Sequence, residues 1–120
     1  MDIHIIGSGS FGTALANSLS TTFRNVVLYA IEKDVVNDIN KNHRNTRYIP
    51  GLELRKNIIA TDKYTKLTSS KIIIFAVPSK VIKNVCNQIR PYYHDQIIIS
   101  ASKGISGQQG AVTDIIKGAL

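Results

Sequence analysis

Three glycines near the start of the chain have the spacing of a phosphate-binding turn, G-x-G-x-x-G. A short apolar run precedes them, and apolar residues at every fourth position follow, so a strand leads into the turn and a helix leaves it. Gly7 permits the tight turn, Gly9 lets a diphosphate approach the backbone, and Gly12 lets the helix pack closely. The N–H groups of Ser10 and Phe11 would then point at phosphate oxygens, helped by the helix dipole. The pattern predicts a dinucleotide site; the alternative is a glycine turn without a ligand.

An acidic side chain occupies the position at which such a turn expects a partner. Glu32 lies about 20 residues beyond the last glycine, shortly after a second apolar run. Its carboxylate would accept hydrogen bonds from the adenosine ribose and repel a 2′-phosphate, which favours NAD over NADP. An acidic residue is equally expected there because it complements the dipole of the helix that begins at this place. Both interpretations of Glu32 stay open.

Alternating strands and helices must position these residues. Strands are expected at residues 3–6, 26–30, 57–60, 71–77 and 96–101. Helices are expected at residues 11–23, 32–39, 62–68, 79–89 and 109–120, and a loop at residues 43–54. Such alternation indicates a parallel sheet with helices on both faces. The predicted fold class is α/β, a Rossmann-type doubly wound parallel sheet with three layers, αβα, in a single domain at residues 1–120.

The composition excludes several classes of protein. The 120 residues, 43% of them hydrophobic, fit one globular domain, and the longest apolar runs are too short for a membrane span. No signal peptide is visible, so we expect a cytoplasmic protein. Cys86 is the only cysteine, which excludes an intrachain disulfide and a cysteine-based metal cluster. The net charge of +7 comes from scattered residues, which argues against nucleic acid and suits a small anionic ligand.

The histidines offer little chemistry. His4 lies inside the first expected strand and is interpreted as a satisfied sheet residue, and His94 as a surface residue in a turn. His43 could order the loop that follows it. No Ser-His-Asp grouping and no metal-ligand spacing stands out, so no catalytic residue and no metal ligand is assigned.

Five strings, in order along the chain, resemble those of one family of proteins. The family opens with G-x-G-x-[WFY]-G-T-A-L-A, and this chain has GSGSFGTALA at residues 7–16. Residues 43–51, HRNTRYIPG, are similar to the family's H-x-N-x-x-Y-L-P-G loop. The other three strings are VLYA at residues 27–30, AVPS at 76–79 and SKGI at 102–105. The chain thus resembles the NAD(P)-dependent glycerol-3-phosphate dehydrogenases.

The resemblance implies roles for several side chains. Ser10, Phe11 and Tyr48 would contact the cofactor, and position 31 would lie beside the adenosine. Ile31 can pack on adenine but cannot bind a 2′-phosphate, so the expected cofactor is NAD or NADP, with a lean to NAD. Lys103 follows the last expected strand, at the edge where open α/β sheets bind ligands. In the family a lysine here reaches both the cofactor and the substrate.

The resemblance also implies a reaction, hydride transfer between NAD(P)H and dihydroxyacetone phosphate to give sn-glycerol 3-phosphate for glycerophospholipid biosynthesis. The partner is then a small phosphate ester, and the full-length protein could form a homodimer. Family members continue into a helical domain that supplies the acid/base lysine, so this chain looks like an amino-terminal fragment, inactive alone. The alternatives are a free-standing dinucleotide-sensing domain and a related dehydrogenase of β-hydroxyacids or sugar acids.

Overall fold

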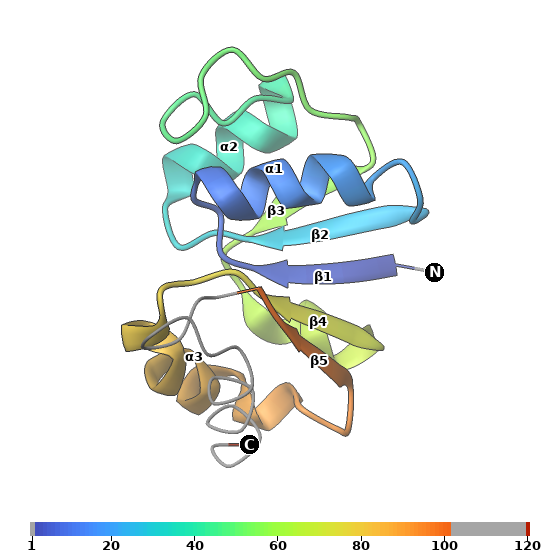
Figure 1. Cartoon of the computed structure of the whole chain (residues 1–120), viewed down its shortest axis with the longest axis vertical. Coiled ribbons are helices and arrows are strands. Elements are labelled where there is room, and N and C mark those ends of the chain that lie inside the picture. Colours follow the sequence, from blue (N-terminus) through green and yellow to red (C-terminus); the bar gives the residue numbers. More distant parts are fainter. Residues whose placement is uncertain (1, 102–119) are drawn as a thin grey trace.

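The computed structural model describes residues 2–101 and Leu120, and its centre is a five-stranded sheet (Figure 1). The strands are β1 (Asp2–Ile6), β2 (Asn25–Tyr29), β3 (Ile58–Thr61), β4 (Ile72–Phe75) and β5 (Ile97–Ser100). Their order in the sheet is β3-β2-β1-β4-β5, and all four pairings are parallel. The chain therefore reverses its direction of travel between β1 and β4, which is where open α/β sheets form a ligand crevice.

Helices cover both faces of the sheet, which confirms the predicted three-layer Rossmann fold. They are α1 (Ser10–Leu19), α2 (Lys33–Asn42) and α3 (Ile82–Ile89), with short 3₁₀ helices η1 (Tyr64–Ser69), η2 (Ser79–Val81) and η3 (Arg90–Tyr92). The helices α1 and α2 lie on one face, and α3 lies with η1 on the other (Figure 1).

Successive side chains along each strand point to opposite faces of the sheet, so the core has two parts, one under each layer of helices. On β1, Ile3 and Ile5 pack with α1 and α2, whereas Ile6 packs with α3. Both faces are apolar because both are covered, which explains why the strands read as continuous β-branched runs. Burial of each of these side chains stabilises the fold by roughly 1.5–3 kcal/mol.

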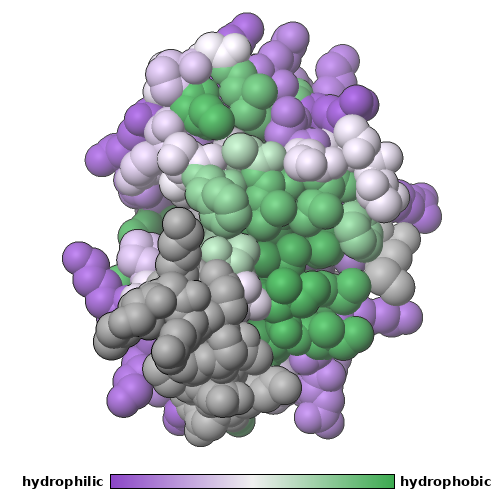
Figure 2. Space-filling model, viewed as in Figure 1, coloured by the Kyte–Doolittle hydropathy of each residue, from purple (hydrophilic) through white to green (hydrophobic). Residues whose placement is uncertain are grey.

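One part of the sheet lacks a helix among the described residues. On the α1 side of β4 and β5, Ile97 and Ile99 are exposed, and their parallel partners are Ile72 and Ile74. Figure 2 shows hydrophobic side chains gathered over this part of the surface, beside α1. Within the described residues, no helix combines the length and the apolar character needed to cross a bilayer.

Several element boundaries differ from those expected. The first helix ends at Leu19 rather than at residue 23, because the hydroxyls of Ser20 and Thr21 donate to the carbonyl oxygens of Asn17 and Ser18. These local bonds compete with continued helix formation. The helix expected at residues 79–89 is divided into η2 and α3, and that at 62–68 is the 3₁₀ helix η1. The helix expected at 109–120 lies outside the described residues, Leu120 excepted.

Candidate functional site

The glycine turn joins β1 to α1 at the carboxyl edge of the sheet. Gly7 has a φ of +119°, which few residues with a side chain adopt, and its N–H donates to the carbonyl oxygen of Tyr29 at 3.1 Å. A Cβ at Gly7 would lie 2.3 Å from the carbonyl oxygen of Ala76, and one at Gly12 would lie 1.9 Å from that of Gly7. Both glycines are therefore required by the packing of backbone against backbone.

Among the described residues, no atom lies where a side chain at Gly9 would begin. Gly9 is the N-cap of α1, with a φ of −68°, and a Cβ placed on it would meet no atom of the described part of the chain within 4 Å. The N–H groups in the first turn of any α-helix have no acceptor within the helix, so those of Ser10 and Phe11 are available to an anion. The corner above Gly9 is an open cradle that a side chain would narrow.

Two clefts meet at this corner. One, of about 480 Å³, lies on the α3 side and is lined by the turn, by the end of β2 and by α3, including Ile31, Glu32 and Tyr48. The other, of about 470 Å³, is lined by Gly9, Ser10, Phe11, Gly12, Ala76, Val77, Pro78 and Ala101. Gly9 and residues 76–78 line both clefts. A long ligand with a diphosphate at its centre can thus span the two, with its middle at Gly9.

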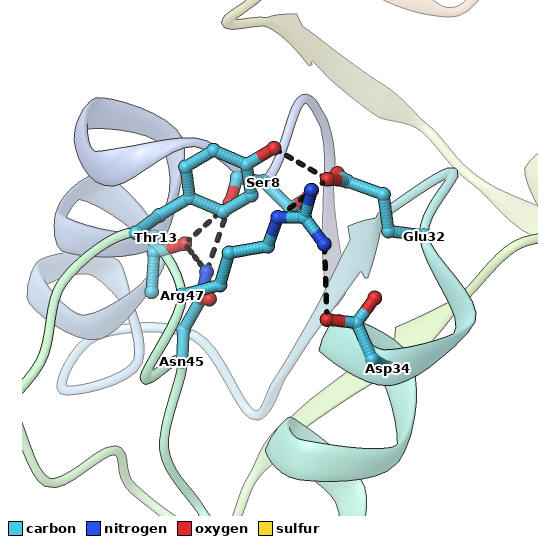
Figure 3. A network of polar contacts seen from close by, with 7 residues as sticks. Ser8, Thr13, Glu32, Asp34, Asn45 and Arg47 are labelled. Carbon is cyan, nitrogen blue, oxygen red and sulfur yellow. Dashed lines mark hydrogen bonds and ion pairs between the residues drawn. The ribbon is translucent and has the colours of Figure 1, made fainter.

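A buried asparagine holds the glycine turn from outside. Asn45 is fully buried, and its Nδ2 donates to the carbonyl oxygen of Ser8 at 2.9 Å and to the hydroxyl of Thr13 at 2.8 Å (Figure 3). The Thr13 hydroxyl donates in turn to the same Ser8 carbonyl, at 3.1 Å. The loop after α2 is thereby attached to the turn after β1. Sequence reasoning did not assign a role to Asn45, although its place in the matched loop was a signal.

A second polar cluster lies at the far end of the α3-side cleft. The Tyr48 hydroxyl donates to Glu32 Oε2 at 2.5 Å, and Arg47 Nε lies 3.1 Å from the same oxygen. Arg47 Nη1 also contacts Asp34 Oδ2 at 3.2 Å, and its guanidinium lies 5.7 Å from the centre of the Tyr48 ring (Figure 3). The hydrogen bond to Glu32 raises the pKa of Tyr48. The hydrogen bond to Asp34, followed by the charge of Glu32, raises the pKa of Arg47.

The loop that carries these residues is anchored on α2. Asp38 accepts a hydrogen bond of 2.8 Å from the backbone N–H of Thr46 and one of 2.9 Å from Asn42 Nδ2, and these bonds lower its pKa. His43 ends α2 in the left-handed conformation, with a φ of 57°, and its carbonyl oxygen accepts from the N–H of Leu54 at 2.7 Å. His43 thus helps to close the loop at its base.

The structure brings most of the predicted site residues to one edge of the sheet. Ile31 is 81% exposed at the rim of the cleft, beside Glu32 and Tyr48, and Phe11 is exposed at the other cleft. Lys103 lies outside the described residues, so its role stays a prediction.

The remaining histidines and the cysteine lie away from both clefts. His4 is buried in the sheet, where its Nδ1 bonds the Tyr29 hydroxyl at 2.8 Å, and Cys86 is buried in the core. His94 Nε2 lies 2.6 Å from the Thr68 carbonyl oxygen. No group of His, Cys, Asp or Glu suited to hold a metal ion occurs among the residues that the structure describes.

Comparison with known proteins agrees with this geometry. Residues 2–120 match the family model described as the NAD-dependent glycerol-3-phosphate dehydrogenase N-terminus. A glycerol-3-phosphate dehydrogenase [NAD(P)+] of Clostridium botulinum is 44% identical over 105 residues, which cover 86% of this chain and 32% of the relative.

The chain also resembles solved structures of glycerol-3-phosphate dehydrogenases. The glycerol-3-phosphate dehydrogenase of Coxiella burnetii superposes with a TM-score of 0.84 at 26% identity, over 99% of this chain and 37% of that one. The enzyme of Plasmodium falciparum superposes with a TM-score of 0.87 at 25% identity, over 100% of this chain and 38% of that one. The chain spans about a third of the length of the curated relatives it matches.

Proposed function

Because the chain belongs to the family of NAD-dependent glycerol-3-phosphate dehydrogenases, whose amino-terminal region its residues 2–120 match, we propose that it binds a nicotinamide dinucleotide across its glycine turn, as the cofactor domain of such an enzyme. The open cradle at Gly9, where the two clefts meet, is the observation that carries the proposal. The residues present fit this cofactor.

In this proposal the diphosphate lies over Gly9 and accepts hydrogen bonds from the N–H groups of Ser10 and Phe11. Two negative charges at this place are favoured by the positive end of the α1 dipole. A methyl group at residue 9 would occupy the same space, whereas those at Gly7 and Gly12 would collide with the protein's own backbone. The three glycines therefore divide into one for the ligand and two for the fold.

The adenosine occupies the α3-side cleft. Ile31 packs against the adenine, and Glu32 accepts hydrogen bonds from the ribose hydroxyls. The Tyr48 and Arg47 contacts with Glu32 both use Oε2, which leaves Oε1 for the ribose. Because Tyr48 and Arg47 hold this carboxylate in place, little ordering is needed when the ribose binds.

The nicotinamide occupies the other cleft, beside Phe11. The bound dinucleotide supplies the hydride, which the full enzyme would exchange with dihydroxyacetone phosphate to give sn-glycerol 3-phosphate. Among the described residues that line this cleft, Ser10 is the only one whose side chain carries an exchangeable proton. Lys103 is proposed to hold the substrate, a small phosphate ester. The principal proton donor would come from another part of the enzyme.

Titration calorimetry with NADH tests the binding proposal. We expect saturable binding of one NADH per chain, with competition by ADP-ribose, which shares the diphosphate. We also expect no steady oxidation of NADH when dihydroxyacetone phosphate is added to the 120-residue chain. Absence of saturable binding would contradict the cofactor site, and sustained turnover would contradict the assignment of proton transfer to another part of the enzyme.

A further inference from the structure

A cation lies at the adenosine end of the site, and it comes from the loop rather than from position 31. The side chain at position 31 is Ile31, which is uncharged and 81% exposed. The guanidinium of Arg47 instead contacts Glu32 and stacks on Tyr48, two residues that line the adenosine cleft. Arg47 does not line the cleft itself, but it contacts the carboxylate to which the ribose hydroxyls are proposed to bind.

Arg47 is placed so that it can change partners. Its side chain is 55% exposed, and its two acceptors, Glu32 and Asp34, are 24% and 63% exposed. Ion pairs this accessible to water are weak, so little is lost when one of them opens. Stacking on the Tyr48 ring keeps the guanidinium near the cleft in either arrangement. A phosphate group, with more charge than a carboxylate, is a stronger bidentate partner for arginine.

The carboxylates of Glu32 and Asp34 make a nearby cation such as Arg47 necessary for binding of a 2′-phosphate. A 2′-phosphate on the ribose would lie near Glu32 and Asp34, and without compensation both would repel it. In the structure Arg47 already neutralises one of these charges. Lys33 adjoins Glu32 in the sequence but is exposed, and the ion pairs that Glu32 and Asp34 make with described residues are both to Arg47. Removal of Arg47 would therefore remove the attraction between its guanidinium and the 2′-phosphate, and it would leave the repulsion by the two carboxylates uncompensated.

Resting on the proposed function, we infer that Arg47 determines how tightly this site binds NADP(H), because its guanidinium exchanges Glu32 for the 2′-phosphate. With NAD(H), Arg47 stays on Glu32, and the carboxylate receives the ribose hydroxyls. With NADP(H), Arg47 binds the phosphate and shields it from the two carboxylates. The sequence left the cofactor open, with a lean to NAD from Glu32 and Ile31, and Arg47 adds one movable positive charge that favours NADP(H).

The test compares NADH and NADPH affinities of the full chain by titration calorimetry at one fixed ionic strength. We expect the unmodified chain to bind the two within about tenfold of each other, a difference of about 1.4 kcal/mol or less. Arg47→Met should weaken the binding of NADPH at least about tenfold and the binding of NADH less than about threefold. Arg47→Lys should retain part of the NADPH affinity, because it keeps the charge without the bidentate geometry. Glu32→Gln should strengthen the binding of NADPH and weaken the binding of NADH.

The control variant is Arg55→Met, which removes the same charge from an exposed arginine outside both clefts. Equal losses of NADPH affinity in Arg47→Met and Arg55→Met would overturn the inference, since only the overall charge would then matter. A larger loss of NADPH affinity in Lys33→Met than in Arg47→Met would show that Lys33 binds the 2′-phosphate, and this result would also overturn the inference. Binding of NADH with no measurable NADPH binding would overturn the inference and leave the proposed function standing. If neither cofactor binds, the proposed function fails, and the inference fails with it.

Discussion

Asn45 donates a hydrogen bond of 2.9 Å to the backbone carbonyl oxygen of Ser8, which lies 37 residues earlier in the chain. The bond joins the loop that carries Tyr48 to the turn that carries Gly9. The parts of the candidate site proposed for adenosine and for diphosphate are therefore joined by a buried hydrogen bond. A substitution at Asn45 should therefore alter both the loop that carries Tyr48 and the turn that carries Gly9.

The first prediction concerns this connection. Asn45→Ala removes the hydrogen bonds to Ser8 and Thr13 from a fully buried position. We expect the free energy of unfolding to fall by about 1–3 kcal/mol, because the Ser8 carbonyl loses one of its two side-chain donors and a cavity is left. Urea unfolding measures this loss, and calorimetry should show weaker NADH binding. Asn37→Ala, at an exposed position of α2, is the control, with an expected change within about 0.5 kcal/mol. An equally small change in Asn45→Ala would contradict the connecting role.

The second prediction separates the glycines. Gly9→Ala should lower the thermal midpoint far less than Gly12→Ala, because its Cβ would meet no described atom within 4 Å, yet it should weaken NADH binding at least about tenfold, or about 1.4 kcal/mol. Gly12→Ala should instead destabilise the fold, because its Cβ would lie 1.9 Å from the Gly7 carbonyl oxygen. Thermal unfolding followed by NADH titration distinguishes the two. The idea fails if Gly9→Ala binds NADH as tightly as Ser18→Ala, an exposed control on α1.

The third prediction concerns stability in acid. The hydrogen bonds from Thr46 and Asn42 hold the folded-state pKa of Asp38 below its ordinary 3.8. The unfolded chain binds the proton more readily, so this contribution is complete above pH 3.8 and is lost as the pH falls through the lowered pKa. Asp38→Asn should be less stable at neutral pH and should lose less stability on acidification. Urea unfolding below about pH 5 measures both slopes, and parallel slopes would refute the assignment.

The fourth prediction concerns His4. Burial is the main cause that lowers its pKa from 6.5, with a smaller opposing effect of Asp2. The folded state therefore binds fewer protons than the unfolded state just below pH 6.5, so stability is complete above that pH and decreases as the pH falls through the lowered pKa. Titration of the His4 ring by nuclear magnetic resonance measures the folded-state value. A midpoint at or above 6.5 would show that the ring is not held neutral beside Tyr29.

Much of the fold was predictable because its causes are local. Apolar runs of four or five residues, alternating with apolar residues at helical spacing, predicted five strands and their helices, and the sheet is parallel as expected. Boundaries were less accurate where side chains compete with the backbone, as at Ser20 and Thr21. The division of residues 79–89 between η2 and α3 is a further difference from the expected boundaries.

The sequence by itself determined the glycine turn, the parallel sheet and the family, since glycine spacing and hydrophobic period are properties of neighbouring residues. The glycine spacing also predicted that Gly9 serves the ligand and Gly12 the packing, but only the tertiary structure shows the atoms involved: a Cβ at Gly12 would meet the Gly7 carbonyl oxygen, whereas one at Gly9 would meet no described atom within 4 Å. The tertiary structure also decided that Asn45 holds the turn and that Arg47 and Tyr48 share Glu32. Those contacts depend on how a loop crosses the edge of the sheet, and that path follows from the packing of the whole core, which no local pattern records.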